Sequence, residues 1–333
     1  MIEQNISLKN YNTFGIDVKT ESFVAIKSET ELVEILQGHE DKPFRVLGGG
    51  SNILLTEDYK GLTLVMKNKG ISIKDGTETN VIIEVKAGEN WHQLVLWSLD
   101  NEFGGIENLA LIPGSVGAAP IQNIGAYGVE LKSVFHSCKA LDLGNLTFKE
   151  FDKSACEFGY RNSVFKKKLK GKVIITSVQL QLQKKPHQTQ THYGAIKNAI
   201  EGKQLNIQNI AAAVISIRKS KLPDPNEIGN SGSFFKNPVI PKKHFKELQS
   251  LYPEIPHYPD QNNHVKIPAG WLIEKLGYKG KRYGDAGVHK KQALVLVNYG
   301  QAKGSDLLNL ALEIQTQIIE HFQIRLEIEV NLL

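Results

Sequence analysis

The spacing of apolar residues in the first third of the chain predicts two amphipathic helices among several short strands. Leu32 and Leu36 lie four residues apart, and Ser28 followed by Glu31 forms a capping box ahead of them. Gly38 is expected to end this first helix. The other predicted elements are strands at 44–47, 62–66, 71–73 and 81–87, and a second helix at 90–101.

Two longer strands are predicted in the middle of the chain, at 134–143 and 173–183. In the second of them, Val178, Leu180 and Leu182 alternate with glutamines. Successive side chains of a strand point to opposite faces, so one face of this strand should contact water.

Helices separated by proline and glycine follow from about residue 190. A stripe formed by Ile210, Val214 and Ile217 predicts one helix, and two more are expected between Pro268 and Gly277 and at 305–322. This change of pattern predicts a domain boundary between residues 184 and 194, in a chain long enough for two or three domains. The expected organisation is a first region at 1–188 with two α+β subdomains split near 67, a second α+β region at 194–325, and a terminal strand at 326–333.

Two glycine-rich segments fit neither a helix nor a strand. Residues 113–128, PGSVGAAPIQNIGAYG, combine four glycines with two prolines and no charge. Residues 48–52, GGGSN, directly follow a predicted strand, and successive backbone amides there are suited to bind a pyrophosphate. A tight buried turn is the ordinary alternative for one such segment, but two are present. Neither has G-x-G-x-x-G or GK[ST] spacing, so the Rossmann and Walker folds are poorly supported.

A third segment, GNSGSFFKNP at 229–238, contains Ser231 and Ser233. Serine between glycines is usually a turn residue, and the absence of G-x-S-x-G spacing argues against a hydrolase nucleophile. The alternating segment 326–330 is predicted as a strand whose polar face accounts for Glu327 and Glu329 without any chemistry. The histidines lack metal-ligand spacing, so no metal site is expected.

The composition is that of an ordinary globular protein, with 41% hydrophobic and 23% charged residues among 333. Residues 1–20 contain no apolar signal region, and no apolar run is long enough to span a bilayer, so we expect a cytoplasmic protein without membrane segments. Two cysteines do not make a disulfide framework, and Cys138 and Cys156 are predicted to be buried thiols.

A net charge of +5 is compatible either with nucleic acid or with a small substrate that carries phosphates. The densest basic run, residues 166–172, has no interleaved aromatic side chains that could stack on bases. It is predicted to form a solvated hairpin, and no nucleic-acid partner is expected.

Six segments follow one another in a characteristic order. They are LGGGSN at 47–52, PGSVGAAPIQNIGAYG at 113–128, FGYR at 158–161, KLPDP at 221–225, GNSGSFFKNP at 229–238 and Glu329-Val330. In this order the chain resembles the bacterial UDP-N-acetylenolpyruvoylglucosamine reductase family, from about Tyr11 to its last residue. The resemblance implies an α+β fold, in which an FAD-binding domain of the p-cresol methylhydroxylase/vanillyl-alcohol oxidase type precedes an α+β substrate-binding domain.

The family's activity, carried over by this resemblance, is an NADPH-dependent reduction of UDP-N-acetylglucosamine enolpyruvate to UDP-N-acetylmuramate for peptidoglycan. The resemblance implies that hydride passes from NADPH to flavin N5 and then to the substrate, that Ser233 donates a proton, and that Arg161 and Glu329 stabilise the intermediate. Ser51 and Asn52 stand where covalently flavinylated relatives have histidine or cysteine, so the FAD should be non-covalent. A monomer is expected.

The resemblance also implies two sets of binding residues. The cofactor set is Gly48, Gly49, Gly50, Ser51, Asn52, Pro113, Gly114, Ser115, Gly117, Ala118, Ile121, Asn123, Gly125, Ala126, Tyr127 and Arg218. The substrate set is Tyr193, Lys221, Asn237, Tyr258 and Gln292. Tyr193 and Tyr258 indicate the longer subtype of the family, which has a tyrosine loop.

One departure from the family pattern lies at the end of the chain. The usual L-E-P-E-V-R is here LEIEVN, with Ile328 and Asn331 in place of the proline and the arginine. The contacts of that arginine are therefore not carried over to this chain. Two other classes of protein stay open as alternatives: a basic nucleic-acid-binding module without flavin, and a flavin oxidase on the same FAD scaffold that reacts with oxygen.

Overall fold

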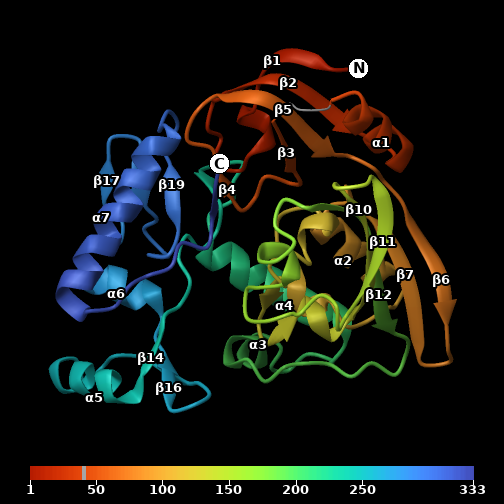
Figure 1. Cartoon of the computed structure of the whole chain (residues 1–333). Coiled ribbons are helices and arrows are strands. Elements are labelled where there is room, and N and C mark those ends of the chain that lie inside the picture. Colours follow the sequence, from red (N-terminus) through yellow and green to blue (C-terminus); the bar gives the residue numbers. More distant parts are fainter. Residues whose placement is uncertain (40–42) are drawn as a thin grey trace. The chain divides into compact units, whose positions relative to one another are not determined.

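The computed structural model describes residues 1–39 and 43–333, which form two compact units (Figure 1). Unit 1 comprises Met1–Asn5, Glu21–Gly49 and Lys60–Ser220. Unit 2 comprises Ile6–Thr20, Gly50–Tyr59 and Lys221–Leu333.

This division corrects the boundary predicted between residues 184 and 194. The helices α3 (Gly194–Ala199) and α4 (Ile207–Lys221) bury Ile196, Ile210 and Val214 in the same hydrophobic core as the strands before them. The structure therefore moves the boundary to Ser220 and Lys221. Burial of these apolar side chains outweighs the change of pattern near residue 190 that the sequence shows.

The first sheet of the chain has the strand order β1-β2-β5-β3, and β3 pairs parallel to β5. Its strands are β1 (Glu3–Ser7), β2 (Lys19–Ile26), β3 (Phe44–Leu47) and β5 (Tyr59–Met66). Helix α1 (Glu29–Gln37) begins where the capping box predicts, since the Ser28 side chain accepts a hydrogen bond from the Glu31 backbone N–H. Leu32 and Leu36 of α1 pack in one core with side chains of β2 and β5.

The second sheet of unit 1 is antiparallel and has the order β11-β10-β12-β7-β6. Its strands are β6 (Ile71–Gly76), β7 (Asn80–Lys86), β10 (Phe135–Asp142), β11 (Thr147–Asp152) and β12 (Val173–Gln183). Helix α2 (Trp91–Asp100) packs against this sheet, and Asn90 and Asn101 cap its ends (Figure 1). The predicted strands and helix are confirmed here. The edge strand β11 was missed because its side chains are mostly exposed and lack apolar alternation.

Glu29 at the start of α1 links the two sheets of unit 1. Its carboxylate accepts a hydrogen bond from Thr176 Oγ1 of β12 at 2.7 Å and one from Lys139 Nζ of β10 at 2.5 Å. Burial raises the pKa of Glu29. These two hydrogen bonds and the positive charge of Lys139 lower it by more, so the pKa lies below its ordinary value.

Unit 2 contains short strands and three helices, which are α5 (Lys242–Leu251), α6 (Ala269–Lys275) and α7 (Gly304–Phe322). One antiparallel sheet is β13 (Gly229–Asn230), β19 (Leu296–Asn298), β18 (Ala286–Val288) and β17 (Arg282–Tyr283). A second is β14 (Val239–Pro241), β16 (His264–Lys266) and β15 (Tyr258–Pro259). The helix predicted between Pro268 and Gly277 and the one predicted at 305–322 are confirmed as α6 and α7, and the stripe of Ile210, Val214 and Ile217 lies in α4 of unit 1. Strands of two or three residues are too short to show a period.

The terminal strand predicted at Leu326–Val330 is wrong as a regular strand. Only an isolated bridge joins Ile328 to Phe235, and a two-residue strand β20 (Asn331–Leu332) pairs parallel to β4 (Ile53–Leu54). The alternation instead reflects burial of Leu326 and Val330 in an irregular segment.

The basic run at 166–172 is mostly exposed to solvent, as predicted, but the predicted hairpin is wrong. A 3-10 turn at Val164–Lys166 and further turns lead directly into β12. Val164 and Phe165 are buried, and their burial fixes this segment to the core of unit 1. Cys138 and Cys156 are buried free thiols, as predicted. The hydrogen bond with the adjacent thiol of Cys156, together with burial, raises the pKa of Cys138, which makes it a poor nucleophile.

Two absences concern residues 1–39 and 43–333. Over these residues, no helix combines the length and the apolar character that a membrane crossing requires. In the same part of the chain, no group of three or more His, Cys, Asp or Glu side chains could hold a metal ion.

Candidate functional site

The two glycine-rich segments contact each other within unit 1. A Cβ atom added to Gly48 would lie 2.4 Å from Ser115 Oγ, and one added to Gly49 would lie 2.6 Å from Gly114 Cα. Real Cβ atoms do not approach other atoms so closely, so a side chain at Gly49 would push the two backbones apart, whereas one at Gly48 would displace the Ser115 hydroxyl. Glycine is therefore required at position 49 by the close approach of two backbones.

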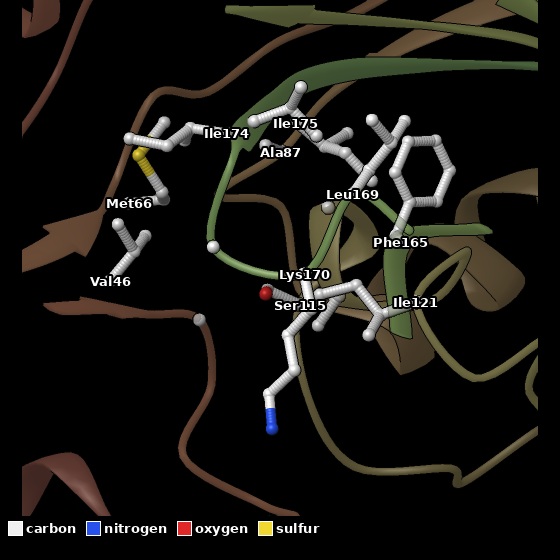
Figure 2. Close-up of a pocket in the computed structure, with 15 residues that line it drawn as sticks. Val46, Met66, Ala87, Ser115, Ile121, Phe165, Leu169, Lys170, Ile174 and Ile175 are labelled. Carbon is white, nitrogen blue, oxygen red and sulfur yellow. The ribbon is translucent and has the colours of Figure 1, made fainter. Parts of the chain in front are cut away.

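A cavity of about 210 Å³ opens beside this contact. Five residues of the predicted cofactor set line it: Gly48, Ser115, Gly117, Ala118 and Ile121. Figure 2 shows Val46 and Met66 on one side of the cavity and Ile121, Phe165 and Leu169 on the other. The cavity is thus apolar along its sides, and the Ser115 hydroxyl lies between them (Figure 2).

The remaining lining residues were not predicted from the sequence. They are Val46, Met66, Ala87, Phe165, Leu169, Lys170, Gly171, Val173, Ile174 and Ile175. Most are apolar residues at strand ends, and such residues look like ordinary core positions in a sequence. Lys170 belongs to the basic run that had suggested a solvated hairpin, and its ammonium group extends away from the apolar side chains (Figure 2).

The segment 113–118 is held on the connection between β7 and α2. The carbonyl oxygen of Gly114 accepts from the Trp91 N–H at 3.0 Å, and the Gly117 N–H donates to the carbonyl oxygen of Ala87 at 2.9 Å. A Cβ added to Gly117 would lie 2.5 Å from the Cβ of Ala87. This part of the loop is therefore fixed by backbone hydrogen bonds and close packing, as a preorganised binding surface requires.

The next part of the same loop, residues 121–123, supports the turn that carries Arg161. Asn123 is fully buried, and its Nδ2 donates to the carbonyl oxygen of Gly159 at 3.1 Å. Ser163 Oγ donates to the carbonyl oxygen of Ile121 at 2.7 Å. These two bonds fix the chain on both sides of Arg161, so the structure brings Arg161 to residues 121–123.

Arg161 occupies a strained position in this turn. Gly159 and Asn162 exchange backbone hydrogen bonds of 3.0 and 3.2 Å, which leaves Tyr160 and Arg161 as the central residues of a tight turn. The φ angle of Arg161 is 51°, in the left-handed region that costs a residue with a side chain about 1–3 kcal/mol. The observed strain supports a functional role for this side chain.

Arg218 of α4 lies with Tyr127 and Tyr193 in unit 1. The pKa of Arg218 lies below its ordinary value, mainly because the side chain is buried. The charge of Arg161 also lowers this pKa, whereas the hydroxyl of Tyr127 raises it through a hydrogen bond. The rings of Tyr127 and Tyr193 are edge to face, with centroids 5.3 Å apart. Arg218 Nε is buried without a hydrogen-bond partner. Two neighbouring guanidinium groups with an unused donor are suited to an anionic ligand.

In unit 2, Ser233 and Glu329 lie on neighbouring segments. The Glu329 N–H donates to the carbonyl oxygen of Phe234 at 2.9 Å, and the Lys236 N–H donates to that of Glu327 at 2.9 Å. Phe234 is buried, whereas Ser233 is exposed and Glu329 is partly buried. The structure therefore pairs the backbone of Glu329 with that of Phe234, the residue after Ser233.

Asn52 belongs to the same part of unit 2. Its Nδ2 donates to the carbonyl oxygen of Glu329 at 3.4 Å. The backbone carbonyl oxygen of Asn52 accepts two hydrogen bonds from Asn331, one from its backbone N–H at 3.0 Å and one from its Nδ2 at 2.9 Å. Asn331, where the family usually has arginine, therefore joins the terminal segment to Asn52.

Asn237 and Gln292 lie at the start of α6. Asn237 Oδ1 accepts from the Ala269 N–H at 2.9 Å, and a Cβ added to Gly270 would lie 3.1 Å from Gln292 Oε1. Tyr258 lies on β15 and Lys221 ends α4, and both side chains are exposed. The predicted residues are divided between the units, with Arg161, Tyr193 and Arg218 in unit 1 and Ser233, Glu329 and the other four substrate residues in unit 2.

Two protein-family models match the chain. One is described as an FAD binding domain and matches residues 20–145. The other is described as the C-terminal domain of UDP-N-acetylenolpyruvoylglucosamine reductase and matches residues 224–333. The predicted fold class, an FAD-binding domain followed by an α+β C-terminal domain, is confirmed by these matches.

Full-length relatives support the same relationship. The UDP-N-acetylenolpyruvoylglucosamine reductase of Flavobacterium johnsoniae is 50% identical over 337 residues, which cover 100% of this chain and 99% of the relative. The enzyme of that name from Pseudomonas putida is 44% identical, with 99% and 98% covered. The crystal structure of UDP-N-acetylenolpyruvylglucosamine reductase from Thermus caldophilus matches with a TM-score of 0.70 at 25% identity, and covers 100% of this chain and 98% of that one.

Proposed function

This chain belongs to the UDP-N-acetylenolpyruvoylglucosamine reductase family and is an FAD-dependent oxidoreductase, and we propose that it reduces UDP-N-acetylglucosamine enolpyruvate to UDP-N-acetylmuramate with NADPH. The product is a peptidoglycan precursor, so the enzyme would serve cell-wall synthesis, cell shape and division from the cytoplasm. The structural observation that carries the proposal is the hydrogen bond of 2.9 Å between Glu329 N and Phe234 O. It supports a joint role for Ser233 and Glu329.

The residues of unit 1 fit an FAD molecule. The contact between the glycine segments leaves backbone and the Ser115 hydroxyl next to an apolar cavity, which suits a pyrophosphate beside an aromatic ring system. Bound FAD supplies a two-electron carrier that accepts hydride from NADPH and delivers it from N5. Ser51 and Asn52 provide no histidine or cysteine for a covalent bond, so we propose non-covalent FAD.

Ser233 is proposed to donate the proton that completes the reduction. Hydride addition to the vinyl carbon leaves a strongly basic carbanion stabilised by the adjacent carboxylate, and the Ser233 hydroxyl is exposed where a ligand could reach it. A weak acid such as serine can protonate such a strong base when both are held within hydrogen-bond distance. Positioned proton transfer of this kind contributes about 10²–10⁴-fold to a rate.

Arg161 and Glu329 are proposed to stabilise this intermediate. The planar guanidinium of Arg161 can donate two parallel hydrogen bonds to a carboxylate that gains negative charge. Glu329 is held by its backbone N–H to Phe234, which fixes its position beside Ser233. Tyr193, Lys221, Asn237, Tyr258 and Gln292 are proposed to bind the rest of the substrate, in which the diphosphate is the most charged group.

Rapid mixing of the purified protein with each substrate tests the proposal. We expect flavin absorption bands, loss of the oxidised band with NADPH under anaerobic conditions, and its return with the enolpyruvyl substrate. Fast reoxidation by oxygen without any response to the enolpyruvyl substrate would instead identify a flavin oxidase. A protein that shows no flavin bands after FAD is added would refute both assignments and leave the nucleic-acid alternative.

A further inference from the structure

Asn108 is a buried amide that joins two segments of unit 1. Only 1% of its surface is exposed. Its Nδ2 donates one hydrogen bond to the carbonyl oxygen of Tyr127 at 3.2 Å and another to that of Gln190 at 2.9 Å. Both N–H groups of one amide are thereby used, one on each segment. Tyr127 belongs to the proposed flavin-binding loop, and Gln190 lies three residues before Tyr193.

The same two segments meet a second time through their side chains. The ring of Tyr127 packs edge to face on the ring of Tyr193, with an interplanar angle of 89°. Tyr193 is 47% exposed, so it forms the accessible end of this contact and Asn108 the buried end. We call residues 187–193 the Tyr193 segment. Its first residues are held elsewhere, since His187 Nε2 bonds to the carbonyl oxygen of Glu102 at 2.9 Å and the Gln188 N–H donates to Gln183 Oε1 at 2.8 Å. The bond from Asn108 and the ring contact attach its last residues, 190–193, to the flavin-binding loop.

Asn108 is itself held on a rigid support. It lies in the 3-10 turn Glu107–Leu109, and the indole N–H of Trp91 donates to the carbonyl oxygen of Leu109 at 3.1 Å. The Leu111 N–H donates to His92 Nδ1 at 3.0 Å. Trp91 and His92 are consecutive residues of α2, so the turn is fixed to a helix. A side chain on such a support can hold an irregular segment in one place.

The two polar atoms of the Asn108 side chain differ in their contacts. Nδ2 donates to two backbone carbonyl oxygens, whereas Oδ1 is buried without a protein partner. The bonds from Nδ2 are therefore the polar contacts by which Asn108 joins the two segments.

We propose that Asn108 is a positioning residue that holds the Tyr193 segment against the flavin-binding loop, so that Tyr193 is in place for the diphosphate end of the substrate. The first part of this inference stands on the contacts of unit 1. The second part rests on the proposed function, which assigns Tyr193 to the substrate.

Hydrogen exchange on the FAD-bound protein tests the attachment. Asn108→Leu removes both donors at nearly constant shape, and Asn108→Ala serves as a second variant that also lacks them. We expect backbone amides of residues 190–197 to exchange at least about tenfold faster in each folded variant. Gln208→Leu is the matched control, since Gln208 Nε2 also donates to a backbone carbonyl, that of Leu99 at 3.3 Å, away from the Tyr193 segment. Unchanged exchange in a folded Asn108 variant would overturn the proposal.

Steady-state kinetics test the consequence for the substrate. A segment that occupies its binding position for a smaller fraction of time lowers the apparent affinity by that fraction, so KM for the enolpyruvyl substrate should rise by about fivefold or more. The kcat value should stay within about threefold, because Asn108 does not contact the reacting atoms. Faster exchange with an unchanged KM would overturn the positioning role. The proposed function is tested separately on the parent protein. It fails if the enolpyruvyl substrate does not reoxidise the reduced flavin of that protein.

Discussion

The backbone N–H of Glu329 donates to the carbonyl oxygen of Phe234, 2.9 Å away, so Glu329 lies beside Ser233 although the two residues are far apart in sequence. The bond uses only backbone atoms, so it does not depend on the side chain of either residue. Substitution of either side chain should therefore change chemistry while the segments stay paired.

Ser233→Ala should slow the oxidation of reduced flavin by the enolpyruvyl substrate by about 10²–10⁴-fold, because the proposed proton donor is lost. Reduction by NADPH should stay close to the parent rate, since that step needs no proton from Ser233. Rapid mixing under anaerobic conditions measures both steps. Ser231→Ala is the matched control: Ser231 Oγ is buried without a partner, so its removal should change stability by no more than about 1 kcal/mol and leave both rates unaltered. Oxidation of the Ser233 variant at the parent rate would remove Ser233 from the mechanism.

Glu329→Gln should slow the same oxidation step by about 10²-fold, because an amide keeps the shape of the side chain but not its charge or basicity. Glu327→Gln is its control, since Glu327 is exposed and forms an ion pair with Lys236. That control should stay within about twofold of the parent. Equal behaviour of the two variants would show that Glu329 has no special part in the reaction.

Arg161→Gly should separate stability from activity. Glycine adopts a φ of 51° without strain, so the free energy of unfolding should stay level or rise by up to about 1 kcal/mol. The kcat/KM value for the enolpyruvyl substrate should fall by at least about 10²-fold, because no guanidinium remains to bind the carboxylate. Thermal unfolding and steady-state kinetics on the same preparation give both values. A marked loss of stability would contradict the strain that we assign to Arg161.

Gly49→Ala should weaken FAD binding by at least about tenfold, because the new Cβ would lie 2.6 Å from Gly114 Cα and must displace the facing loop. The added strain should also lower the free energy of unfolding of the FAD-free protein by about 1–3 kcal/mol. Gly194→Ala is the control, since a Cβ at Gly194 has no atom within 4 Å. Flavin fluorescence titration measures the affinity, and an unaltered Kd for Gly49→Ala would show that the loops can separate without harm.

The lowered pKa of Glu29 predicts how the free energy of unfolding changes with pH. Its pKa lies below the ordinary value of 4.5 in the folded protein, so its contribution is complete above pH 4.5 and is lost as the pH falls through the lower, folded value. Glu29→Gln should lower the free energy of unfolding at neutral pH by about 1 kcal/mol, and the difference between variant and parent should shrink below pH 4.5. Urea unfolding over that pH range measures the difference. A constant difference at every pH would rule out this ionisation as the cause.

Local signals in the sequence were sufficient for the longer elements of the chain. The capping box at Ser28, the apolar spacing in α2 and the alternation in β12 each depend on neighbouring residues only. Edge strand β11 and the two-residue and three-residue strands of unit 2 carry no such period, because they are exposed or too short. The segments 6–20 and 50–59 join unit 2 through pairings with distant residues, which no local pattern contains.

The candidate site was predictable only where a motif marked it. The glycine segments and Ser233 stand in distinctive stretches, and their neighbours Ser115 and Phe234 follow from the same stretches. Asn108 is a single asparagine between ordinary residues, and its two bonds reach 19 and 82 residues along the chain. The role of Asn331 likewise could not be predicted from its neighbours in sequence, because it depends on the hydrogen bond with the distant Asn52.

The chain passes from one compact unit to the other between Gly49 and Gly50, inside the GGGSN turn, and unit 2 collects three separate stretches of sequence. Gene fragments that encode only residues 221–333 would therefore lack β4, the partner of β20, and the backbone of Thr13 that accepts from the Asn230 N–H at 2.9 Å. Recombination between relatives at the apparent junction near residue 220 would combine unmatched halves of one folding unit. Viable exchange of unit 2 during evolution, or in a designed chimera, requires that all three stretches move together.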